Sequence, residues 1–199
     1  ESMGVDGILS VTPYYNRPTQ EGLYQHYKAI AAATRLPIIV YSVQSRTGVN
    51  VEAGTLKRLS EIDNIVGVKE ASGNLAQVAA ILNQAPERFA VLSGDDAVTL
   101  PVMSLGGKGV ISTAANEIPA EMTAIARLAL ANDFPAARAI HRGFLPLMEV
   151  NFVETNPIPV KTSLAMMGKI REEFRLPLCS MTDANRKRLE AALKSYGLL

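Results

Sequence analysis

Five short apolar runs, rich in β-branched residues and bounded by turn residues, constrain the fold of this chain more than any other feature. They are Gly7–Val11, Pro37–Val43, Ile65–Lys69, Phe89–Ser93 and Gly109–Ser112. The runs are nearly continuous in apolarity rather than alternating, which is typical of parallel strands covered on both faces. Their starts lie 20 to 30 residues apart, which is the length of a crossover between parallel neighbours.

Helical periodicity fills the intervals between these predicted strands. Thr19 and Asn74 stand where a side chain commonly caps the first turn of a helix, and Asp95 or Asp96 precedes a further short helix. Strand and helix therefore alternate along the first part of the chain. Two α/β architectures have this order: a doubly wound open sheet, and part of a (β/α)8 TIM barrel.

The strand pattern stops at about residue 118, and the remaining sequence has the periodicity of helices. An Ala- and Leu-rich segment covers 119–131, and apolar residues recur at helical spacing over 134–154. Asn156–Lys161 breaks this helix and begins another, and Thr182 is the predicted cap of a last one. We therefore expect a βα region over 1–118 and a C-terminal helical region over 119–199.

Composition and charge exclude several classes of function. The 199 residues carry 20 Lys and Arg against 19 Asp and Glu, so nothing indicates binding to nucleic acid or to a membrane surface. The single cysteine, Cys179, rules out an internal disulfide framework and a metal site built from several cysteines. No apolar run approaches the roughly 20 residues that span a bilayer, and no secretory signal is visible. These features are expected of a cytoplasmic protein.

Polar residues interrupt the apolar strands at their carboxyl ends, where α/β proteins carry out ligand chemistry. Lys69 follows Ile-Val-Gly-Val, and burial there would favour a neutral amine that attacks carbonyls. Spacing alone slightly favours a simpler interpretation, an ion pair with Glu70 or an ammonium extended into solvent. Tyr41 is either a proton shuttle or a core aromatic. Arg46 either clamps a carboxylate or is a surface loop residue.

Four other candidates carry less chemical information. Tyr14 and Tyr15 form an aromatic pair in the loop after the first strand, and a pair of this kind need have no catalytic part. His26 and His141 lie on predicted helices without a partner at metal-ligand spacing. Taken together, the strand-end residues indicate a site that handles a carbonyl with a lysine nucleophile and no metal.

Six segments in order along the chain point to one family. They are Thr12–Pro18, Tyr41–Gly48, Gly67–Ala71, Leu92–Asp96, Gly109–Ser112 and Asn156–Lys161. Through these segments the chain resembles the dihydrodipicolinate synthase family, the pyruvate-dependent class I aldolases of lysine (diaminopimelate) biosynthesis. The resemblance runs from about Gly4 to Leu199 and implies a (β/α)8 barrel followed by a helical C-terminal region.

The resemblance also implies a reaction and its residues. Pyruvate would form an imine with Lys69, so that no cofactor is needed, and the resulting enamine would attack L-aspartate 4-semialdehyde to give 4-hydroxy-tetrahydrodipicolinate. Tyr41 would relay protons, and Arg46 would hold the carboxylate of the semialdehyde. Gly94 and Ile111 would line the pyruvate pocket.

An assembly is implied as well. In the family, the tyrosine that matches Tyr15 reaches across a dimer interface and completes the proton relay of the neighbouring subunit. Many members are inhibited by lysine at that interface, near the residue that matches Tyr14. The family is usually a homotetramer built as a dimer of dimers, and we expect the same of this protein.

Two departures from the family pattern leave alternatives open. Ser42 and Gln44 stand where the family usually has Asn and Pro, and the absent proline removes a fixed φ from the loop that aims Arg46. The family's Gly-Thr-Thr-Gly-Glu motif, whose threonines bind the pyruvate carboxylate, has no match in the sequence. The alternatives are another Schiff-base aldolase, such as N-acetylneuraminate lyase or a 2-keto-3-deoxy-sugar-acid aldolase, and a catalytically silent truncated fragment.

The number of predicted strands bears on completeness. Five strands cannot close an eight-stranded barrel, and an open sheet would expose backbone donors and apolar side chains at its edges. Three further βα units at the observed spacing would add about 60–90 residues. We therefore expect these to be the last five strands of a barrel whose first three units are absent.

Overall fold

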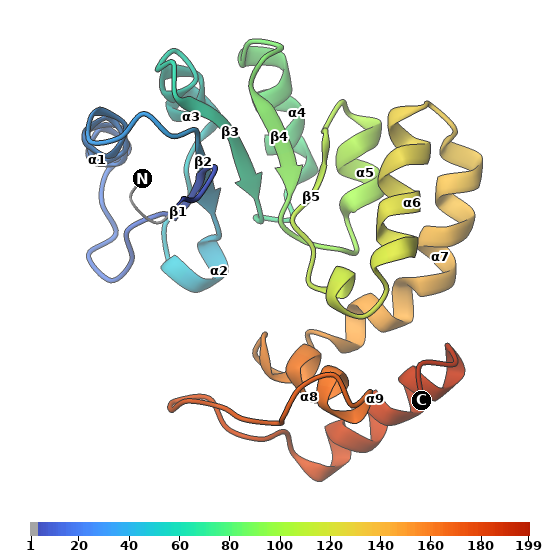
Figure 1. Ribbon diagram of the computed structural model, residues 1–199. Coiled ribbons are helices and arrows are strands. Elements are labelled where there is room, and N and C mark those ends of the chain that lie inside the picture. Colours follow the sequence, from blue (N-terminus) through green and yellow to red (C-terminus); the bar gives the residue numbers. More distant parts are fainter. Residues whose placement is uncertain (1–3) are drawn as a thin grey trace. The chain divides into compact units, whose positions relative to one another are not determined.

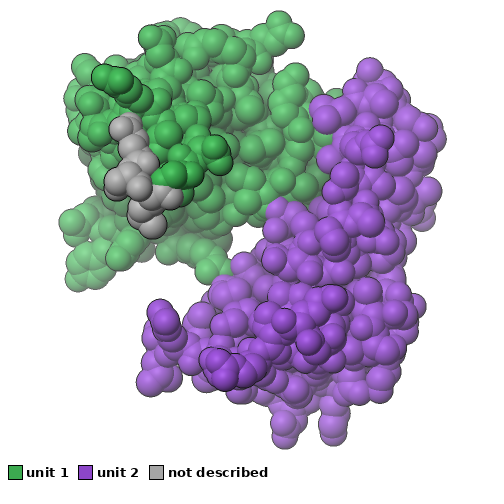
Figure 2. Space-filling model, viewed as in Figure 1, with its two compact units in different colours: residues 1–111 green, residues 112–199 purple. Residues whose placement is uncertain are grey.

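The chain folds into two compact units, residues 1–111 and residues 112–199, coloured separately in Figure 2. The computed structural model describes residues 4–199. All strands of the described residues lie in the first unit, and the second unit is helical. The division falls a few residues before the expected boundary at residue 118, because the short 3-10 helix η1 (Ala114–Asn116) contacts α6 (Pro119–Leu130).

The first unit is built on a five-stranded sheet whose strands are parallel and follow the order of the chain (Figure 1). The strands are β1 (Ile8–Val11), β2 (Ile38–Ser42), β3 (Ile65–Glu70), β4 (Ala90–Ser93) and β5 (Gly109–Val110). The helices are α1 (Gln20–Ala32), α2 (Gln44–Thr47), α3 (Ala53–Leu59), α4 (Leu75–Gln84) and α5 (Thr99–Ser104). Each predicted apolar run coincides with one of the strands, with β3 continuing one residue beyond its run to Glu70, so the predicted order of alternating strands and helices is confirmed.

Side-chain caps explain where two of these helices begin. Thr19 accepts a hydrogen bond from the backbone N–H of Gly22 at 3.2 Å and starts α1. Asn74 accepts one from the N–H of Gln77 at 3.1 Å and starts α4. Each cap satisfies one of the N–H groups that the first turn leaves without a partner in the helix. Both predicted caps are confirmed.

The prediction that Asp95 or Asp96 caps a helix is wrong. Helix α5 begins at Thr99, after Val98, which makes no side-chain capping bond. The carboxylate of Asp95 accepts instead from the backbone N–H of Ala97 at 2.9 Å. The aspartate therefore closes the turn between β4 and α5, a use that competes with capping for the same residue type.

The two faces of the sheet are buried to different degrees. One face packs against α1, α3, α4 and α5, and together they form the core of the unit. Among its fully buried side chains are Leu23, Tyr27, Ile38, Leu56, Ile65 and Ile81. On the other face, Leu9 and Val11 are 47% and 43% exposed. The expectation of strands covered on both faces is therefore met on the helix-covered face only, within the described residues.

The second unit consists of helices, with a long irregular segment over 167–182 before the last of them (Figure 1). After η1 and α6 come α7 (Phe134–Val150), α8 (Ile158–Met166) and α9 (Asp183–Ser195). The helix predicted over 134–154 ends at Val150, and Asn156 and Pro157 precede α8 as expected. Thr182 directly precedes α9, but its hydroxyl donates to Glu154 at 2.9 Å instead of capping the helix.

Candidate active site

Lys69 and Tyr41 lie side by side at the carboxyl ends of two neighbouring strands. The parallel register pairs Tyr41 of β2 with Lys69 of β3. The Lys69 Nζ lies 4.1 Å from the centroid of the Tyr41 ring. Residues at the same register position of adjacent strands point to the same face, so the sheet brings together two residues that are 28 positions apart in sequence.

The surroundings of this pair favour the neutral form of both groups. Lys69 is half-buried, and burial lowers the pKa of its amine; the nearby Arg46 lowers it further, whereas the carboxylate of Asp96 raises it. Burial also raises the pKa of the Tyr41 phenol, against a smaller opposing effect of Arg46. An amine that loses its proton more easily is a better nucleophile, and a phenol that keeps its proton can donate it.

Arg46 is carried by a single helical turn, α2, directly after β2. The turn is closed by hydrogen bonds from the N–H groups of Thr47 and Gly48 to Val43 and Gln44, at 3.0 and 2.9 Å. Gly48 ends it with φ of +73°, a left-handed conformation that glycine adopts without steric cost. Gln44 occupies the first helical position, where a proline would fit. The turn forms without the family's proline.

Two buried threonines attach this turn to the first strand. Thr12, directly after β1, donates from its hydroxyl to the hydroxyl of Thr47 at 3.2 Å, and its N–H donates to the carbonyl of Tyr41 at 3.0 Å. Thr47 in turn lies within hydrogen-bond distance of the carbonyls of Val43 and Val49, at 3.1 and 3.0 Å. The exposed Arg46 side chain therefore projects from a backbone that is held on both sides.

Gly94 and Ile111 follow the next two strands at the same edge of the sheet. The N–H of Gly94 donates to the carbonyl of Glu70 at 2.7 Å, and that of Ile111 donates to the carbonyl of Ser93 at 2.9 Å. A Cβ atom on Gly94 would lie 2.6 Å from the Cβ of Ala71. Only glycine fits at this close approach of Gly94 to Ala71. Gly94 and Ile111 both belong to the strand-end region that holds Lys69.

Tyr14 and Tyr15 are not brought to this cluster within the chain. They lie in the loop after β1 and are 71% and 89% exposed. Tyr15 has a φ of +63°, in the left-handed region that side chains other than glycine adopt at a cost. The exposure and the unusual backbone distinguish Tyr15 from an ordinary aromatic residue, which would bury its ring.

The structure contradicts an ion pair between Lys69 and Glu70. Alternation along β3 turns the Glu70 side chain to the helix-covered face, where it is 2% exposed. There its carboxylate accepts from the N–H of Ser72 at 3.2 and 3.3 Å and from the amide of Gln77 at 3.0 Å. Burial raises the pKa of Glu70, while the bonds from Ser72 and Gln77 lower it.

Sequence reasoning missed the partners of Glu70. Gln77 also forms a reciprocal pair with Asn50, with distances of 2.6 and 3.1 Å. Asn50 accepts from the hydroxyl of Ser42 at 3.4 Å, and this hydroxyl accepts from the N–H of Val51 at 3.2 Å. An acidic residue at the end of an apolar strand is the one signal that could have indicated a buried polar network.

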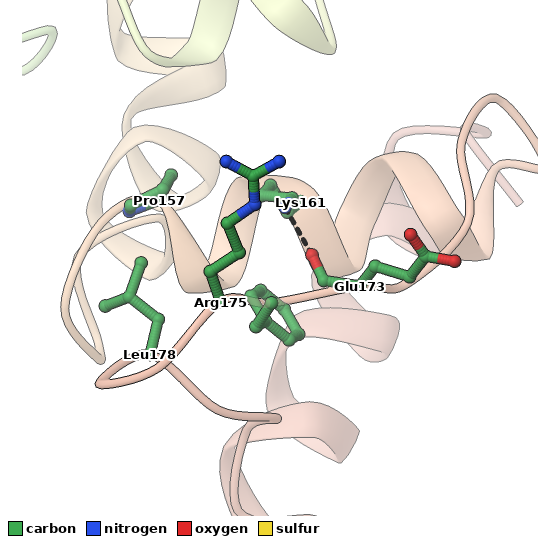
Figure 3. A pocket seen from close by; sticks show the side chains of 6 residues that line it. Pro157, Lys161, Glu173, Arg175 and Leu178 are labelled. Atoms are coloured by element: carbon green, nitrogen blue, oxygen red, sulfur yellow. Dashed lines mark hydrogen bonds between the residues drawn. The ribbon is translucent and has the colours of Figure 1, made fainter.

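The second unit has a cavity of its own, of about 620 Å³, formed where the Asn156–Lys161 segment meets the loop before α9 (Figure 3). It is lined by Pro157, Lys161, Glu173, Phe174, Arg175 and Leu178. Lys161 donates to the backbone carbonyl of Glu173, and its ammonium lies 5.0 Å from the centroid of the Phe174 ring. These contacts give the lysine of the sixth motif a local structural function.

No group of three or more His, Cys, Asp or Glu side chains among residues 4–199 is placed to hold a metal ion. No helix formed by the described residues is both long enough and apolar enough to cross a membrane.

Comparison with known proteins agrees with the fold and with the motifs. The family model for the dihydrodipicolinate synthetase family matches residues 1–196. The 4-hydroxy-tetrahydrodipicolinate synthase of Syntrophus aciditrophicus is 53% identical over 98% of this chain and 67% of its own length. The chloride-inhibited dihydrodipicolinate synthase of Acinetobacter baumannii, solved as a complex with pyruvate, is 45% identical with a TM-score of 0.97, over 100% of this chain and 68% of that one.

A third protein extends the comparison. The enzyme of Cyanidioschyzon merolae, solved with lysine bound, is 42% identical with a TM-score of 0.97, over 100% of this chain and 67% of that one. The chain spans about two thirds of the length of the curated relatives it matches, 67% of one and 65% of another. These matches confirm the predicted α/β fold class, with the five strands forming part of a barrel. By sequence and by fold, the chain belongs to the dihydrodipicolinate synthetase family.

Proposed function

We propose that this chain carries the lysine nucleophile of a 4-hydroxy-tetrahydrodipicolinate synthase, a carbon–oxygen lyase that condenses pyruvate with L-aspartate 4-semialdehyde. One observation carries the proposal: a half-buried lysine beside a tyrosine phenol at the carboxyl ends of adjacent parallel strands. Active sites of (β/α)8 enzymes are found at this edge of the sheet. The identity to named synthases across the whole chain supports the choice of reaction.

The first half of the proposed reaction takes place on Lys69. Its neutral amine attacks the keto carbon of pyruvate, and loss of water gives an iminium joined to the Nζ. Removal of a proton from the methyl carbon gives an enamine, which forms the new carbon–carbon bond with the aldehyde carbon of the semialdehyde. The amino group of the condensed semialdehyde then attacks the iminium carbon and displaces the lysine nitrogen, which closes the ring of the product and restores the free amine of Lys69. Because the lysine itself supplies the imine nitrogen, the proposed reaction requires no cofactor.

We assign the neighbouring residues roles that agree with their positions at the strand ends. Tyr41, whose ring centroid lies 4.1 Å from the amine, donates and accepts protons through its phenol during imine formation and cyclisation. Arg46 binds the carboxylate of the semialdehyde through its planar guanidinium. Gly94 and Ile111 line the pyruvate pocket, since both lie at the strand-end edge that holds Lys69.

We further propose that the protein acts as a homotetramer, a dimer of dimers, in the cytoplasm. Tyr15 would extend into the site of a second copy and complete its proton relay, which agrees with a side chain that is 89% exposed and held in an unusual conformation. We also propose that lysine inhibits this protein with Tyr14 at the inhibitor site; the related enzyme that was solved with lysine bound supports the binding of lysine.

Borohydride reduction in the presence of labelled pyruvate tests the chemical step. We expect the label on Lys69, located by peptide mass spectrometry, in the native gene product that contains this sequence. Lys57→Met, which alters an exposed lysine of α3, is the matched control and should leave labelling unchanged. A folded protein that takes no label on Lys69 would show the proposal to be wrong.

A second assay separates the proposed synthase from the alternatives. We expect consumption of pyruvate with aspartate semialdehyde and no cleavage of N-acetylneuraminate or of 2-keto-3-deoxy sugar acids. Cleavage of either substrate would instead assign the chain to another aldolase of the superfamily. Labelling without turnover would support a silent protein that retains only the nucleophile.

A further inference from the structure

We propose that Gln77, on α4, is a positioning residue for the Arg46 loop: together with Glu70, Asn50 and Ser42 it forms a partly buried amide–carboxylate network that fixes this loop against the strand bearing Lys69. The inference rests on the proposed function, and it adds a residue that neither the motifs nor the family resemblance indicated.

The network begins directly behind the two proposed catalytic residues. Ser42 follows Tyr41, Glu70 follows Lys69, and the register of β2 with β3 pairs Ser42 with Glu70. Alternation places Ser42 and Glu70 on the helix-covered face, with exposures of 0% and 2%. The catalytic side chains and the network therefore share the same two strand ends but occupy opposite faces of the sheet.

Gln77 connects these strand ends to the loop that carries Arg46. Its Nε2 donates to the Glu70 carboxylate at 3.0 Å and to the Asn50 Oδ1 at 3.1 Å, and its Oε1 accepts from the Asn50 Nδ2 at 2.6 Å. Asn50 lies four residues after Arg46 in the same loop. The backbone carbonyl of Asn50 also accepts from Gln20 of α1 at 2.8 Å, so the loop is hydrogen-bonded to α1 as well as to α4.

The direction of every bond in the network is determined by Glu70. A carboxylate only accepts hydrogen bonds, so the Gln77 amide must turn its Nε2 toward Glu70 and its Oε1 toward Asn50. The Asn50 amide must then present its Nδ2 to Gln77, which leaves its Oδ1 to accept from Gln77 and from Ser42. A network with a single consistent orientation holds its members in one arrangement.

The loop depends on this network more than Lys69 does. Lys69 belongs to a strand that is hydrogen-bonded on both sides, to β2 and to β4. Arg46 lies on a turn of four residues, Gln44–Thr47, without the proline of the family pattern. Loss of the Gln77 bonds should therefore displace the loop while the lysine stays in place. The network and Thr12 hold this loop from two sides.

The test is a split between two kinetic readouts in the native gene product. Replacing Gln77 by Leu removes all three side-chain bonds at similar volume. We expect KM for aspartate semialdehyde to rise about tenfold or more, because small displacements of a binding group are costly. Above the pH of half-maximal trapping the lysine is neutral whatever the position of Arg46. There the rate of borohydride trapping with pyruvate should change less than about twofold, because Lys69 is held by its strand. Gln25→Leu, at an exposed glutamine of α1, is the matched control and should leave both readouts unchanged.

The exchange variant Glu70→Gln/Gln77→Glu serves as the conservative rescue. The carboxylate placed at position 77 would accept from Asn50 and from the new amide at position 70, whose oxygen would still accept from Ser72. The charge is retained and most bonds can re-form, so we expect KM to return to within about threefold of the wild-type value. This variant also answers the case in which Gln77→Leu fails to fold.

Each outcome decides the proposal. A raised KM with unchanged trapping, restored by the exchange, supports it. An unchanged KM in Gln77→Leu overturns it, as does an equal loss of both readouts together with a lowered Tm, which indicates a structural role only. A folded exchange variant that keeps the raised KM also overturns it. If the wild-type protein itself is not trapped by pyruvate, the proposed function fails instead, and the two failures are thereby distinguished.

Discussion

The helix-covered face of the sheet and its opposite face differ in what they contain at the same strand ends. The first holds an apolar core and the fully hydrogen-bonded Glu70 and Ser42. The second holds the half-buried Lys69 and Tyr41. Residues that are adjacent in sequence thus differ in both chemistry and surroundings, because successive side chains of a strand point to opposite faces.

For the nucleophile proposed at Lys69, this difference explains how the fold would keep a reactive amine in place. The amine needs a partly desolvated position with few hydrogen-bond partners, which contributes little to stability. The opposite face supplies that stability through apolar burial and a satisfied polar network. If this division is correct, substitutions on the two faces should separate activity from stability.

The largest effect is expected at Lys69 itself. Lys69→Met should reduce synthase activity by about three orders of magnitude or more, because the covalent step is lost. The free energy of unfolding should remain close to the wild-type value, since the side chain is half-buried and lies outside the apolar core. Activity and urea unfolding measured on the same sample test both parts. Borohydride trapping at another lysine with retained activity would contradict the assignment.

The next largest effect is a loss of stability from the helix-covered face. Leu56→Ala leaves a cavity at a fully buried position and should lower the free energy of unfolding by about 2–5 kcal/mol. Leu105→Ala makes the same chemical change directly after α5, where the side chain is 43% exposed, and should cost less than about 1 kcal/mol. Urea titrations of both variants give the difference. Equal losses would show that the apolar core beneath the helices does not supply the stability assigned to it.

Removing a phenol oxygen should affect activity on one face of the sheet and stability on the other. Tyr41→Phe should slow imine formation and turnover by about 100-fold, because a positioned proton donor is lost while the ring stays. Tyr27→Phe removes a hydroxyl that donates to Ser10 at 3.1 Å on the helix-covered side, and should lower stability by about 1 kcal/mol without slowing imine formation. Stopped-flow measurement of pyruvate binding tests the pair. Slow imine formation in Tyr27→Phe would contradict the assignment of the proton donor to Tyr41 alone.

Sequence reasoning placed Tyr41 and Lys69 at neighbouring strand ends because the signals for that position are local, whereas their proposed roles came from the family resemblance. A lysine and a tyrosine that interrupt apolar runs are visible in the sequence, and the regular spacing of the runs predicts the parallel neighbours that bring Tyr41 and Lys69 together. The caps Thr19 and Asn74 were predictable for the same reason, because each acts within three residues of its own position.

The supporting face could not be predicted in the same way. The bond between Gln77 and Asn50 joins an amide in the first turn of a helix to one in a loop 27 positions earlier, and neither residue type implies the other. The misassigned Asp95 and Asp96 show a related limit. Aspartate is common both in turns and at helix caps, and tertiary packing decides between the two uses. The position of the α5 start therefore required the structure.

A smaller effect is expected where α4 begins. Asn74 caps this helix by accepting from the N–H of Gln77, so Asn74→Ala should cost about 1 kcal/mol of stability. It should also raise KM for aspartate semialdehyde about two- to threefold by loosening the turn that carries Gln77. Asp133→Ala removes the side-chain cap of α7 in the second unit, where Asp133 accepts from the N–H of Ala136 at 3.1 Å, and should cost as much stability with no change in KM. Identical kinetics in the two variants would break the proposed link between α4 and the Arg46 loop.

The smallest effect concerns the charge environment of the amine. The Asp96 carboxylate raises the pKa of Lys69 and partly opposes the lowering caused by burial. Asp96→Asn removes that charge at nearly constant volume, so the pKa of the amine should fall further and the pH at which trapping with pyruvate is half-maximal should move to lower values. At a fixed pH below this midpoint the trapping rate should rise, by less than about tenfold, because more of the lysine is neutral.

A variant of opposite sign makes this last prediction specific. Arg46 lowers the pKa of Lys69, so Arg46→Gln should move the trapping midpoint to higher pH. Trapping requires pyruvate alone, so loss of the group proposed to bind the semialdehyde does not interfere with the measurement. Shifts of the same sign in both variants would mean that the charges do not act directly on the amine, and that its reactivity is determined by burial on its own face of the sheet.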